Sequence, residues 1–508
     1  MTADSATPHP SEASGPHPPR FRWLIRLGVV SVVIVAAVAG LRWWWGDISS
    51  RRLNALIDAA HARGERIVVA DYASERDLPD ERNLAVYLRR ADKAAAKFTK
   101  TEDWAISNAG ALPLREDLFQ TVGQAIANHP QVLAELRAAR DVKEADWGLN
   151  VVSPMWSVLL PHLNMLRRLG NISRAAALHA AQRGDHAEAI EHVLDMTPIL
   201  RSLDDQPFLV THLVRMGIGA LAADTTGELA TELQIAGDDR SAPALPTTQP
   251  ATRPASRQQV RALIVALLDD QSQRAAFQEA FRGERAAQVD IGLTLSRRAR
   301  LVRPALELDT AQLASEGERL VAAARATNLP AARTGLPGAP TVKGPRTVAH
   351  VVSQSVRPAL GRAYSTIHRG VADARLAATA LAIRLYQHDH AGQRPPTLAA
   401  LVPDYLPSVP DDPMGPAGTK IGYVADPVAP YVYSVGENGG DDSAGAPNVP
   451  PWRPDAKSDR YKSPDLFLNL TRVNAPEPDI EDPPEMDEEP AEMVPPGEPG
   501  APATAPAP

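Results

Sequence analysis

The longest run of apolar residues in the chain lies near its start, at residues 23–45 (WLIRLGVVSVVIVAAVAGLRWWW). No charged residue lies between Leu27 and Leu41, and with the flanking tryptophans the run reaches the roughly 20 residues that a helix needs to cross a bilayer. Trp43–Trp45 fits an aromatic belt at the membrane–water interface. The pattern predicts a transmembrane helix over 23–45 that follows a disordered N-terminal tail at 1–22.

Two other interpretations of this run stay open. Ala37-Val38-Ala39 supplies a small-x-small sequence after a short apolar core, as in a cleaved signal peptide. A buried helix of a soluble protein fits less well, because the adjacent tryptophans 43–45 would face every side. Basic residues are balanced across the run (Arg20, Arg22 and Arg26 before it; Arg42, Arg51 and Arg52 after it). The layout of a short polar tail before one apolar helix predicts a cytoplasmic N-terminus, with the bulk of the chain extracytoplasmic, in the periplasm.

Helical periodicity dominates the middle of the chain. Leu53, Leu56, Ile57 and Ala60 form one apolar stripe, and similar stripes recur to about residue 329. Residues 176–194 contain two alanine-rich halves that meet at Gly184-Asp185, which predicts a helical hairpin resembling a tetratricopeptide unit. Proline-rich breaks then predict a division into a helical domain, a linker, a second helical block and another linker, at 51–240, 241–256, 257–329 and 330–345.

The C-terminal part of the chain predicts a small α+β module at 346–472. One face of its long helix is apolar, and Gly392 is placed to end that helix, with Thr397 as cap of a short second one. Tyr423, Tyr431, Tyr433 and Val435 favour strands, and residues 465–470 (DLFLNL) alternate as a last strand. Residues 473–508 are acidic and rich in proline, which predicts a disordered tail. The fold class is therefore mainly α, with one small sheet.

Charge and composition exclude several classes of function. The net charge of −8 arises from the tail, since ten of the 61 acidic residues lie in 475–508. The remainder carries 53 basic and 51 acidic residues, so no basic surplus is present to bind nucleic acid. The absence of cysteine excludes disulfides, thiolate metal sites and cysteine nucleophiles.

The helical region carries no motif of a known catalytic site, and the chain is predicted not to be an enzyme. Glu191, His192 and Asp195 are the residues that a hydrolase site in this region would use, and that alternative stays open. His179, His186 and His192 straddle the Gly184 turn without the spacing of a zinc site, so we expect them at the surface. The pair Glu284-Arg285 follows a predicted break at Gly283 and is expected in an exposed turn between helices.

The order of landmarks in the C-terminal region resembles the major pseudopilin of type II secretion. The landmarks are Tyr386, Asp389, Gly392, Pro395 and Leu398 after the helix, then Asp412-Pro413-Met414-Gly415, Tyr423, Ser434-x-Gly436 and Asp465-Leu466. The resemblance covers about residues 371–470 and implies a helix packed on a small antiparallel sheet, with a loop that commonly binds calcium. The pseudopilin processing site has no counterpart here, because Gly28 begins GVVSVVIVAA without the expected glutamate.

The resemblance makes the loop after the second strand a candidate calcium site. Asn438, Asp441, Asp442 and Asp465, together with backbone carbonyls near the glycines, are the oxygen ligands that calcium prefers. A metal-free solvated loop is the competing interpretation.

Together these patterns predict a membrane-anchored, non-enzymatic scaffold or interaction protein of the bacterial envelope, with envelope proteins as partners. One alternative is a secretion- or pilus-associated component that docks through the C-terminal module, and the other is the envelope hydrolase.

Overall fold

The computed structural model describes residues 22–72, 78–237, 252–336, 351–442 and 465–472. The predicted tails at 1–22 and 473–508 lie outside the described residues, except for Arg22, which begins the first helix. Most of the predicted linker at 241–256 and of the one at 330–345 also lies outside them. What is described is mainly helical with one small sheet, as the apolar pattern predicts.

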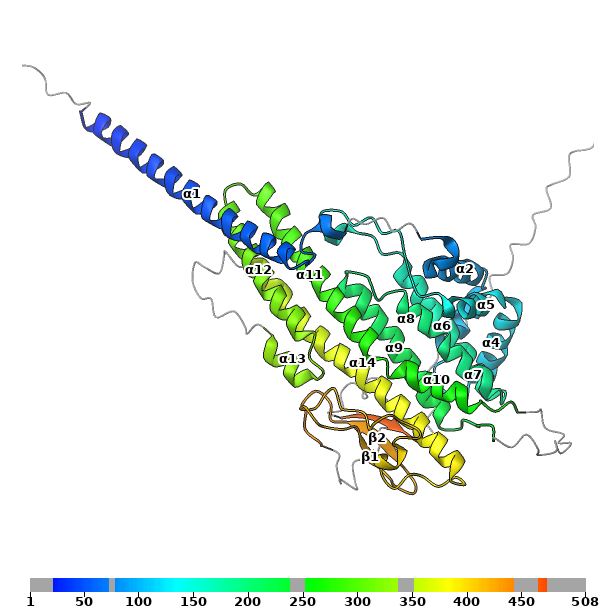
Figure 1. Ribbon diagram of the computed structural model, residues 1–508. Helices are drawn as coiled ribbons and strands as arrows, with labels where there is room; N and C mark the ends of the chain where they lie inside the picture. The colour runs from blue at the N-terminus through cyan, green and yellow to red at the C-terminus, as the bar shows by residue number, and fades with distance from the viewer. Residues whose placement is uncertain (1–21, 73–77, 238–251, 337–350, 443–464, 473–508) are drawn as a thin grey trace, which may run out of the picture.

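The first helix, α1 (Arg22–Ala62), is 41 residues long and continuous. It projects from one end of the body, and the sheet lies near the opposite end (Figure 1). The sequence predicts a membrane helix over 23–45 and a separate helical domain from 51, but the backbone stays helical through Gly46–Ser50. Its C-terminal part packs on α12 (Arg303–Ala323) and buries Leu53 and Ala60.

The helices after α1 form two connected bundles. The first bundle is built around α6, and its core contains apolar residues of the preceding short helices and of the start of α9. Its elements are α2 (Leu84–Ala95), α3 (Lys100–Asn108), α4 (Glu116–Asn128), α5 (Gln131–Ala138), α6 (His162–Gln182), α8 (Met196–Arg201) and α9 (Leu209–Ala230). Short 3-10 turns lie at Val69–Tyr72, Asp80–Arg82, Ala139–Asp141 and Met155–Ser157.

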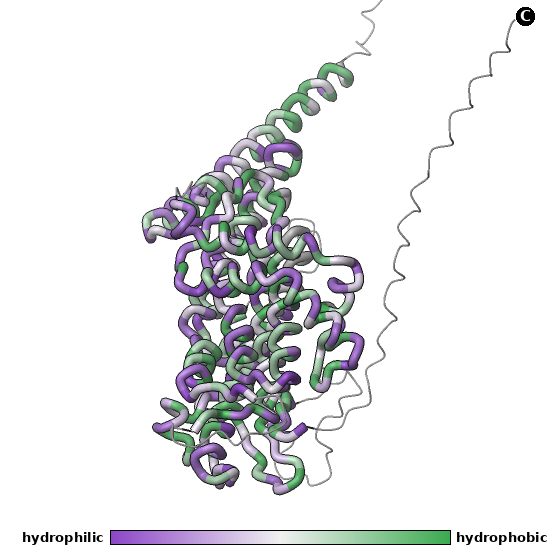
Figure 2. The backbone as a smooth tube through the Cα atoms, turned by 90° about the vertical axis from the view of Figure 1, so that its right-hand side faces the viewer, coloured by the Kyte–Doolittle hydropathy of each residue, from purple (hydrophilic) through white to green (hydrophobic). Residues whose placement is uncertain are grey.

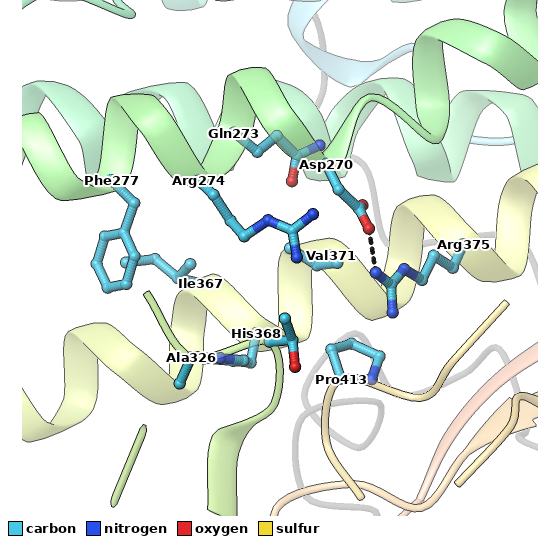
Figure 3. A pocket seen from close by; sticks show the side chains of 11 residues that line it. Asp270, Gln273, Arg274, Phe277, Ala326, Ile367, His368, Val371, Arg375 and Pro413 are labelled. Atoms are coloured by element: carbon cyan, nitrogen blue, oxygen red, sulfur yellow. Dashed lines mark hydrogen bonds and ion pairs between the residues drawn. The ribbon is translucent and has the colours of Figure 1, made fainter. Parts of the chain in front are cut away.

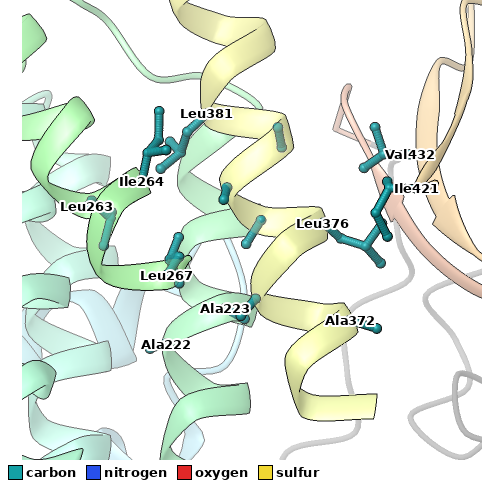
Figure 4. Close-up of a cluster of buried hydrophobic side chains, with 14 of the residues drawn as sticks. Ala222, Ala223, Leu263, Ile264, Leu267, Ala372, Leu376, Leu381, Ile421 and Val432 are labelled. Carbon is teal, nitrogen blue, oxygen red and sulfur yellow. The ribbon is translucent and has the colours of Figure 1, made fainter. Parts of the chain in front are cut away.

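The second bundle surrounds the long helix α14 (Val351–Asp389) and continues into the sheet. Helices α9 and α10 lie on one side of α14, and the sheet lies on the other (Figure 4). Its other helices are α7 (His186–Leu194), α10 (Arg257–Leu267), α11 (Asp270–Arg298), α12 and α13 (Leu329–Gly335). One apolar core thus joins residues from the three regions that the sequence predicts as helical domain, second block and C-terminal module.

The predicted hairpin at 176–194 is confirmed as α6, a turn and α7. Gly184 in the turn has φ +81°, a left-handed conformation that favours glycine. Asp185 caps α7 by accepting the backbone N–H of Glu188. Residues 252–256, the described end of the predicted linker, pack against this turn, and Ala255 is buried.

Helices α11 and α12 form an antiparallel hairpin whose close packing depends on glycines. A Cβ on Gly292 would lie 1.8 Å from Oγ1 of Thr310, and one on Gly283 would lie 1.7 Å from the carbonyl oxygen of Pro207. The predicted helix break at Gly283 is wrong, because α11 runs through it. Glycine stands there to let another segment approach the helix.

The sheet has the order β1-β2-β3 and is antiparallel throughout. Gly422 pairs with Tyr433, and Ser434 pairs with Leu466, so β1 (Gly422–Val424), β2 (Tyr431–Ser434) and β3 (Leu466–Asn469) match the predicted strands. The predicted end of the long helix is confirmed as well, since Gly392 follows α14 with φ +84°. Thr397 precedes only a 3-10 turn, Leu398–Leu401, and its side chain makes no capping hydrogen bond.

Candidate functional site

The exposed half of α1 carries a long apolar surface that no other described element covers. Every residue from 23 to 41 is exposed, and the apolar character extends to the free end of the helix (Figure 2). By length and composition this helix can cross a membrane, and none of its most apolar stretch is buried within the protein. Because a bare apolar surface of this size is unfavourable in water, the segment is a candidate for contact with lipid.

A buried carboxylate fastens the middle of α1 to α12. Ser49 and Ser50 donate hydrogen bonds to Oε2 of Glu307 at 2.8 and 2.7 Å, and Nε of Arg303 donates to Oε1 at 2.7 Å. Burial alone would raise the pKa of Glu307, but these hydrogen bonds and the arginine charge hold it below its ordinary value. An ionised, fully bonded carboxylate at this point fixes the anchor helix relative to the body.

A second ionic contact fastens the segment just after α1. Nη1 of Arg285 lies 2.7 Å from Oε2 of Glu65, and Nε of Arg285 donates to the carbonyl of Ala314 at 2.9 Å. The pKa of Glu65 falls to about 2, chiefly through hydrogen bonds from Arg63, with Arg285 adding to the effect against the opposing influence of burial. The helix that would cross the membrane is therefore bound to the α11–α12 hairpin at both serines and at Glu65.

The expected position of Glu284-Arg285 in an exposed turn is wrong. Arg285 is 4% exposed in the middle of α11, and burial raises the pKa of Glu284. A Cβ on Gly317 of α12 would lie 2.5 Å from Cγ of Arg285, so the glycine makes room for the arginine. The sequence around Arg285 does not predict its burial, because its acidic partner, Glu65, is more than 200 residues away in the chain.

Glu191, His192 and Asp195, the residues predicted for a hydrolase site, lie close together. They form part of a network of ion pairs with arginines. Asp195 is fully buried and accepts from Arg137 at 2.9 Å and from Nε of Arg140 at 2.7 Å. Glu191 pairs with Arg140 and accepts from Gln259 at 2.6 Å. The network ties α5 and the turn after it to α7 and α10.

The electrostatics of this network favour a structural role. Burial would raise the pKa of Asp195, but the adjacent His192 ring, the hydrogen bond from Arg137 and the charges of both arginines keep it below the ordinary value. Hydrolysis by paired carboxylates needs one of them protonated near neutral pH and open to substrate. The pKa of Glu191 is lowered as well, so neither carboxylate is held protonated, and Asp195 is 0% exposed.

The three histidines around the hairpin are not at the surface as predicted. His186 and His192 are buried, and His179 is half-buried against Phe119. Burial lowers the pKa of His179 to about 4 and also lowers that of His186, so both are neutral at neutral pH. In the part of the chain that the structure describes, no group of three or more His, Asp or Glu side chains is placed to hold a metal.

Three of the predicted calcium ligands lie in the loop after β2, and the fourth, Asp465, lies at the start of β3. Asn438 donates its amide N–H to Asp442, and its oxygen accepts from the backbone of Gly440 at 3.0 Å. Asp441 accepts from the hydroxyl of Tyr433 at 3.0 Å. Asp465 is fully buried at the start of β3, and burial together with the charges of Asp441 and Asp465 raises the pKa of Tyr433. The calcium site stays a prediction.

Asp412, which was not predicted as a calcium ligand, links two segments at this end of the molecule. Asp412, 2% exposed, accepts from Ser434 at 2.8 Å, from the backbone of Val435 at 2.8 Å and from that of Met414 at 2.9 Å. It therefore joins the Asp-Pro-Met-Gly segment to β2. The order Asp412…Ser434 was visible in the sequence as part of the resemblance, but its structural role was not predicted.

A small pocket lies between α11, α14 and the loop that contains Pro413 (Figure 3). Asp270, Gln273 and Arg274 reach toward His368 and Arg375, and Arg375 forms an ion pair with Asp270. The pocket offers about 20 Å³ to the centres of water-sized molecules, which is room for one or two waters. A space of this size suits bridging water.

Comparison with known proteins adds no assignment: no protein-family model, curated protein or solved structure matches this chain. The candidate site is therefore defined by the structure alone: an exposed apolar helix whose C-terminal part packs on the folded body.

Proposed function

We propose that the protein is a single-pass, membrane-anchored scaffold or interaction protein of the bacterial envelope, without enzymatic activity. The observation that supports the proposal most strongly is α1, in which residues 23–41 are all exposed while Leu53 and Ala60 of the same helix are buried. The exposed half suits lipid, and the packed half transmits its position to the body. A cleavage after Ala39, as a signal peptide would require, would cut this helix in its middle.

The interior of the helical region supports a non-enzymatic role. The carboxylates that would serve a hydrolase are paired with arginines, and the small pocket between α11 and α14 has room for a water or two. A protein of this kind acts through its surfaces, so the proposed partners are envelope proteins. We place the body outside the cytoplasmic membrane, with the N-terminus in the cytoplasm.

The absence of cysteine makes a direct test of anchoring and sidedness simple. Leu159, 84% exposed on the body, is replaced by cysteine, and a second variant carries Ser5→Cys in the N-terminal tail. Intact spheroplasts are treated with a membrane-impermeant maleimide, and membranes are then washed with alkaline carbonate. We expect both variants in the washed membranes, with Leu159→Cys labelled in intact cells and Ser5→Cys labelled only after lysis. The reverse labelling would overturn the sidedness, and release by carbonate would overturn the anchor.

A secretion-associated role is the second candidate, because α14 packs against β2 and β3 as the pseudopilin resemblance implies. Its opposite face is covered by α9 and α10, so docking to another pseudopilin would have to use the sheet or its loops. Affinity purification of the full chain from cells that express a type II secretion system tests this role. Recovery of pseudopilins that is lost in a Tyr423→Ala variant supports it, and recovery of none contradicts it.

A further inference from the structure

The connection between α11 and α12 forms an exposed tip with a composition unlike the rest of the body. Between Arg297 and Arg303, every side chain except Ala299 is exposed. Leu301 is 85% exposed and Val302 is 50% exposed, so two apolar side chains stand at the end of the hairpin. Arginines surround them (Arg297, Arg298, Arg300 and Arg303). We call residues 297–303 the α11–α12 tip.

The tip lies at the level where α1 leaves the body (Figure 1). The guanidinium of Arg42 donates to the carbonyl of Arg300, and a Cβ on Gly46 would lie 3.8 Å from Cγ of Pro304. Residues 42–46 of α1 are the end of the apolar run and include the three exposed tryptophans. When those tryptophans lie at the membrane interface, the tip lies at the interface beside them.

The chemistry of the tip matches that of an interface rich in anionic lipid. Arginine binds phosphate through paired N–H groups and is weakly hydrated, which suits it to lipid headgroups. Basic side chains near an anionic bilayer surface are attracted to it electrostatically. Exposed leucine and valine at the same level can enter the boundary between headgroups and acyl chains. Arg303 is engaged with Glu307, which leaves Arg297, Arg298 and Arg300 as the headgroup ligands.

We propose that the α11–α12 tip is a second membrane contact, which binds the phosphates of anionic phospholipids through Arg297, Arg298 and Arg300 and inserts Leu301 and Val302 into the interface. The proposal rests on the proposed membrane anchor. A single helix leaves the body free to rotate and tilt at the membrane. Because Glu307 fixes α1 against α12, a second contact close to the helix sets one orientation of the body and of the sheet at its far end.

The test uses the full chain in lipid nanodiscs with a single cysteine carrying an environment-sensitive fluorophore. Leu301→Cys reports on the tip, Trp43→Cys reports on the anchor, and Val428→Cys is the matched control. Val428 is 84% exposed, like Leu301, but lies in the C-terminal module. Spin-labelled phospholipids quench the fluorophore only where it meets lipid. We expect quenching at 43 and at 301 in discs that contain phosphatidylglycerol, and none at 428.

The outcomes separate this inference from the proposed function. Quenching at 43 without quenching at 301 overturns the tip contact and leaves the anchor standing. Quenching at neither site overturns both. A fluorophore at 301 that is shielded from water but not quenched by lipid shows a protein contact and also overturns the inference.

A charge variant tests the headgroup ligands. Arg297→Gln, Arg298→Gln and Arg300→Gln are combined in the Leu301→Cys background, and quenching is compared between phosphatidylglycerol and phosphatidylcholine discs. We expect a severalfold loss of quenching at 301 in the anionic discs, with quenching at 43 unchanged. Equal quenching at 301 with and without the three arginines contradicts their assignment. Thermal unfolding of the variant near the parent temperature shows that the change is not a loss of fold.

Discussion

The two longest helices in the described residues, α1 with 41 residues and α14 with 39, have opposite surroundings. In α1 every residue from 23 to 41 is exposed, whereas in α14 every residue from 372 to 383 is buried. Length does not distinguish them. What differs is the size and polarity of the side chains that each presents to its neighbours.

The buried stretch of α14 is built mainly from small residues. Alanines along it let other elements approach from several sides, as Ala222 and Ala223 of α9 do (Figure 4). A Cβ on Gly370 would lie 2.2 Å from the methyl carbon of Met216, so contact is close at this end as well. In α1 the corresponding stretch is rich in valine and isoleucine, and none of the described elements covers it.

Polar residues follow the same division. The buried part of α14 includes Arg375, which pairs with Asp270, and Thr379, which donates to the carbonyl of Arg375 at 2.7 Å. Nδ1 of His368 donates to the carbonyl of Tyr364 at 2.9 Å. Residues 27–41 of α1 contain only one polar side chain, Ser31. A helix buried in protein can contain polar side chains, because neighbouring elements supply their hydrogen-bond partners. A helix exposed to lipid has no such partners and therefore contains almost no polar side chains.

The largest contrast should come from the same truncation in the two helices. Leu381→Ala in α14 removes a fully buried side chain and leaves a cavity, which typically costs about 2–5 kcal/mol of unfolding free energy. Ile34→Ala in α1 removes one that is 56% exposed and packed on no other element, so we expect a change within about 0.5 kcal/mol. Chemical unfolding of both variants in the same detergent measures the difference. Equal losses would show that residues 23–41 pack against the body.

A charge in the exposed half of α1 should weaken insertion without touching the body. Ile34→Arg places an arginine near the centre of the run, where insertion becomes less favourable by about 2.5–3.5 kcal/mol. The equilibrium constant for insertion should fall on the order of a hundredfold, and the fraction retained in carbonate-washed membranes should fall with it. Ile34→Leu serves as the control and should leave that fraction unchanged. Full retention of the arginine variant would argue against a spanning helix.

The ion pair after α1 should make stability depend on pH in acid. The pKa of Glu65 is about 2 in the folded chain against an ordinary 4.5, so its ionised form stabilises the fold. That stabilisation is complete above about pH 4.5 and is lost as the pH falls toward 2. In Glu65→Gln the decline of unfolding free energy over this range should be smaller than in the parent. Asp80→Asn, at an exposed site, controls for loss of charge and should follow the parent curve.

The smallest effect is expected where α1 passes from its exposed half to its packed half. Ser49→Ala removes one of three hydrogen bonds to Glu307 and should cost about 1 kcal/mol of unfolding free energy. A double-mutant cycle with Glu307→Gln isolates the contact, since the serine should matter less once the carboxylate is gone. Additive losses would mean that Ser49 contributes through packing alone.

Local sequence patterns determined much of the fold. The sequence predicts the exposed half of α1, because the side chains of residues 27–41 form no polar face that would suit contact with water. The hairpin at Gly184 and the three strands near Tyr423, Tyr431 and residues 465–470 were also predicted, since turn glycines and alternating apolar residues act over a few positions. The membrane helix, however, was predicted to end at 45, where the apolar run ends, whereas α1 continues to Ala62.

Only the tertiary structure decided the features that depend on distant partners. Ser49 is buried because its hydroxyl binds Glu307, and Arg285 lies in the interior because it pairs with Glu65. Position 283 is glycine because the backbone of Pro207 packs against it. The ion-pair network at Asp195 likewise depends on Arg137 and Arg140, which the fold places beside it. Periodicity records which face of a helix avoids water, but it carries no information about which remote charge or backbone will meet that face. The burial of a polar side chain is therefore set by long-range packing, not by its neighbours in the chain.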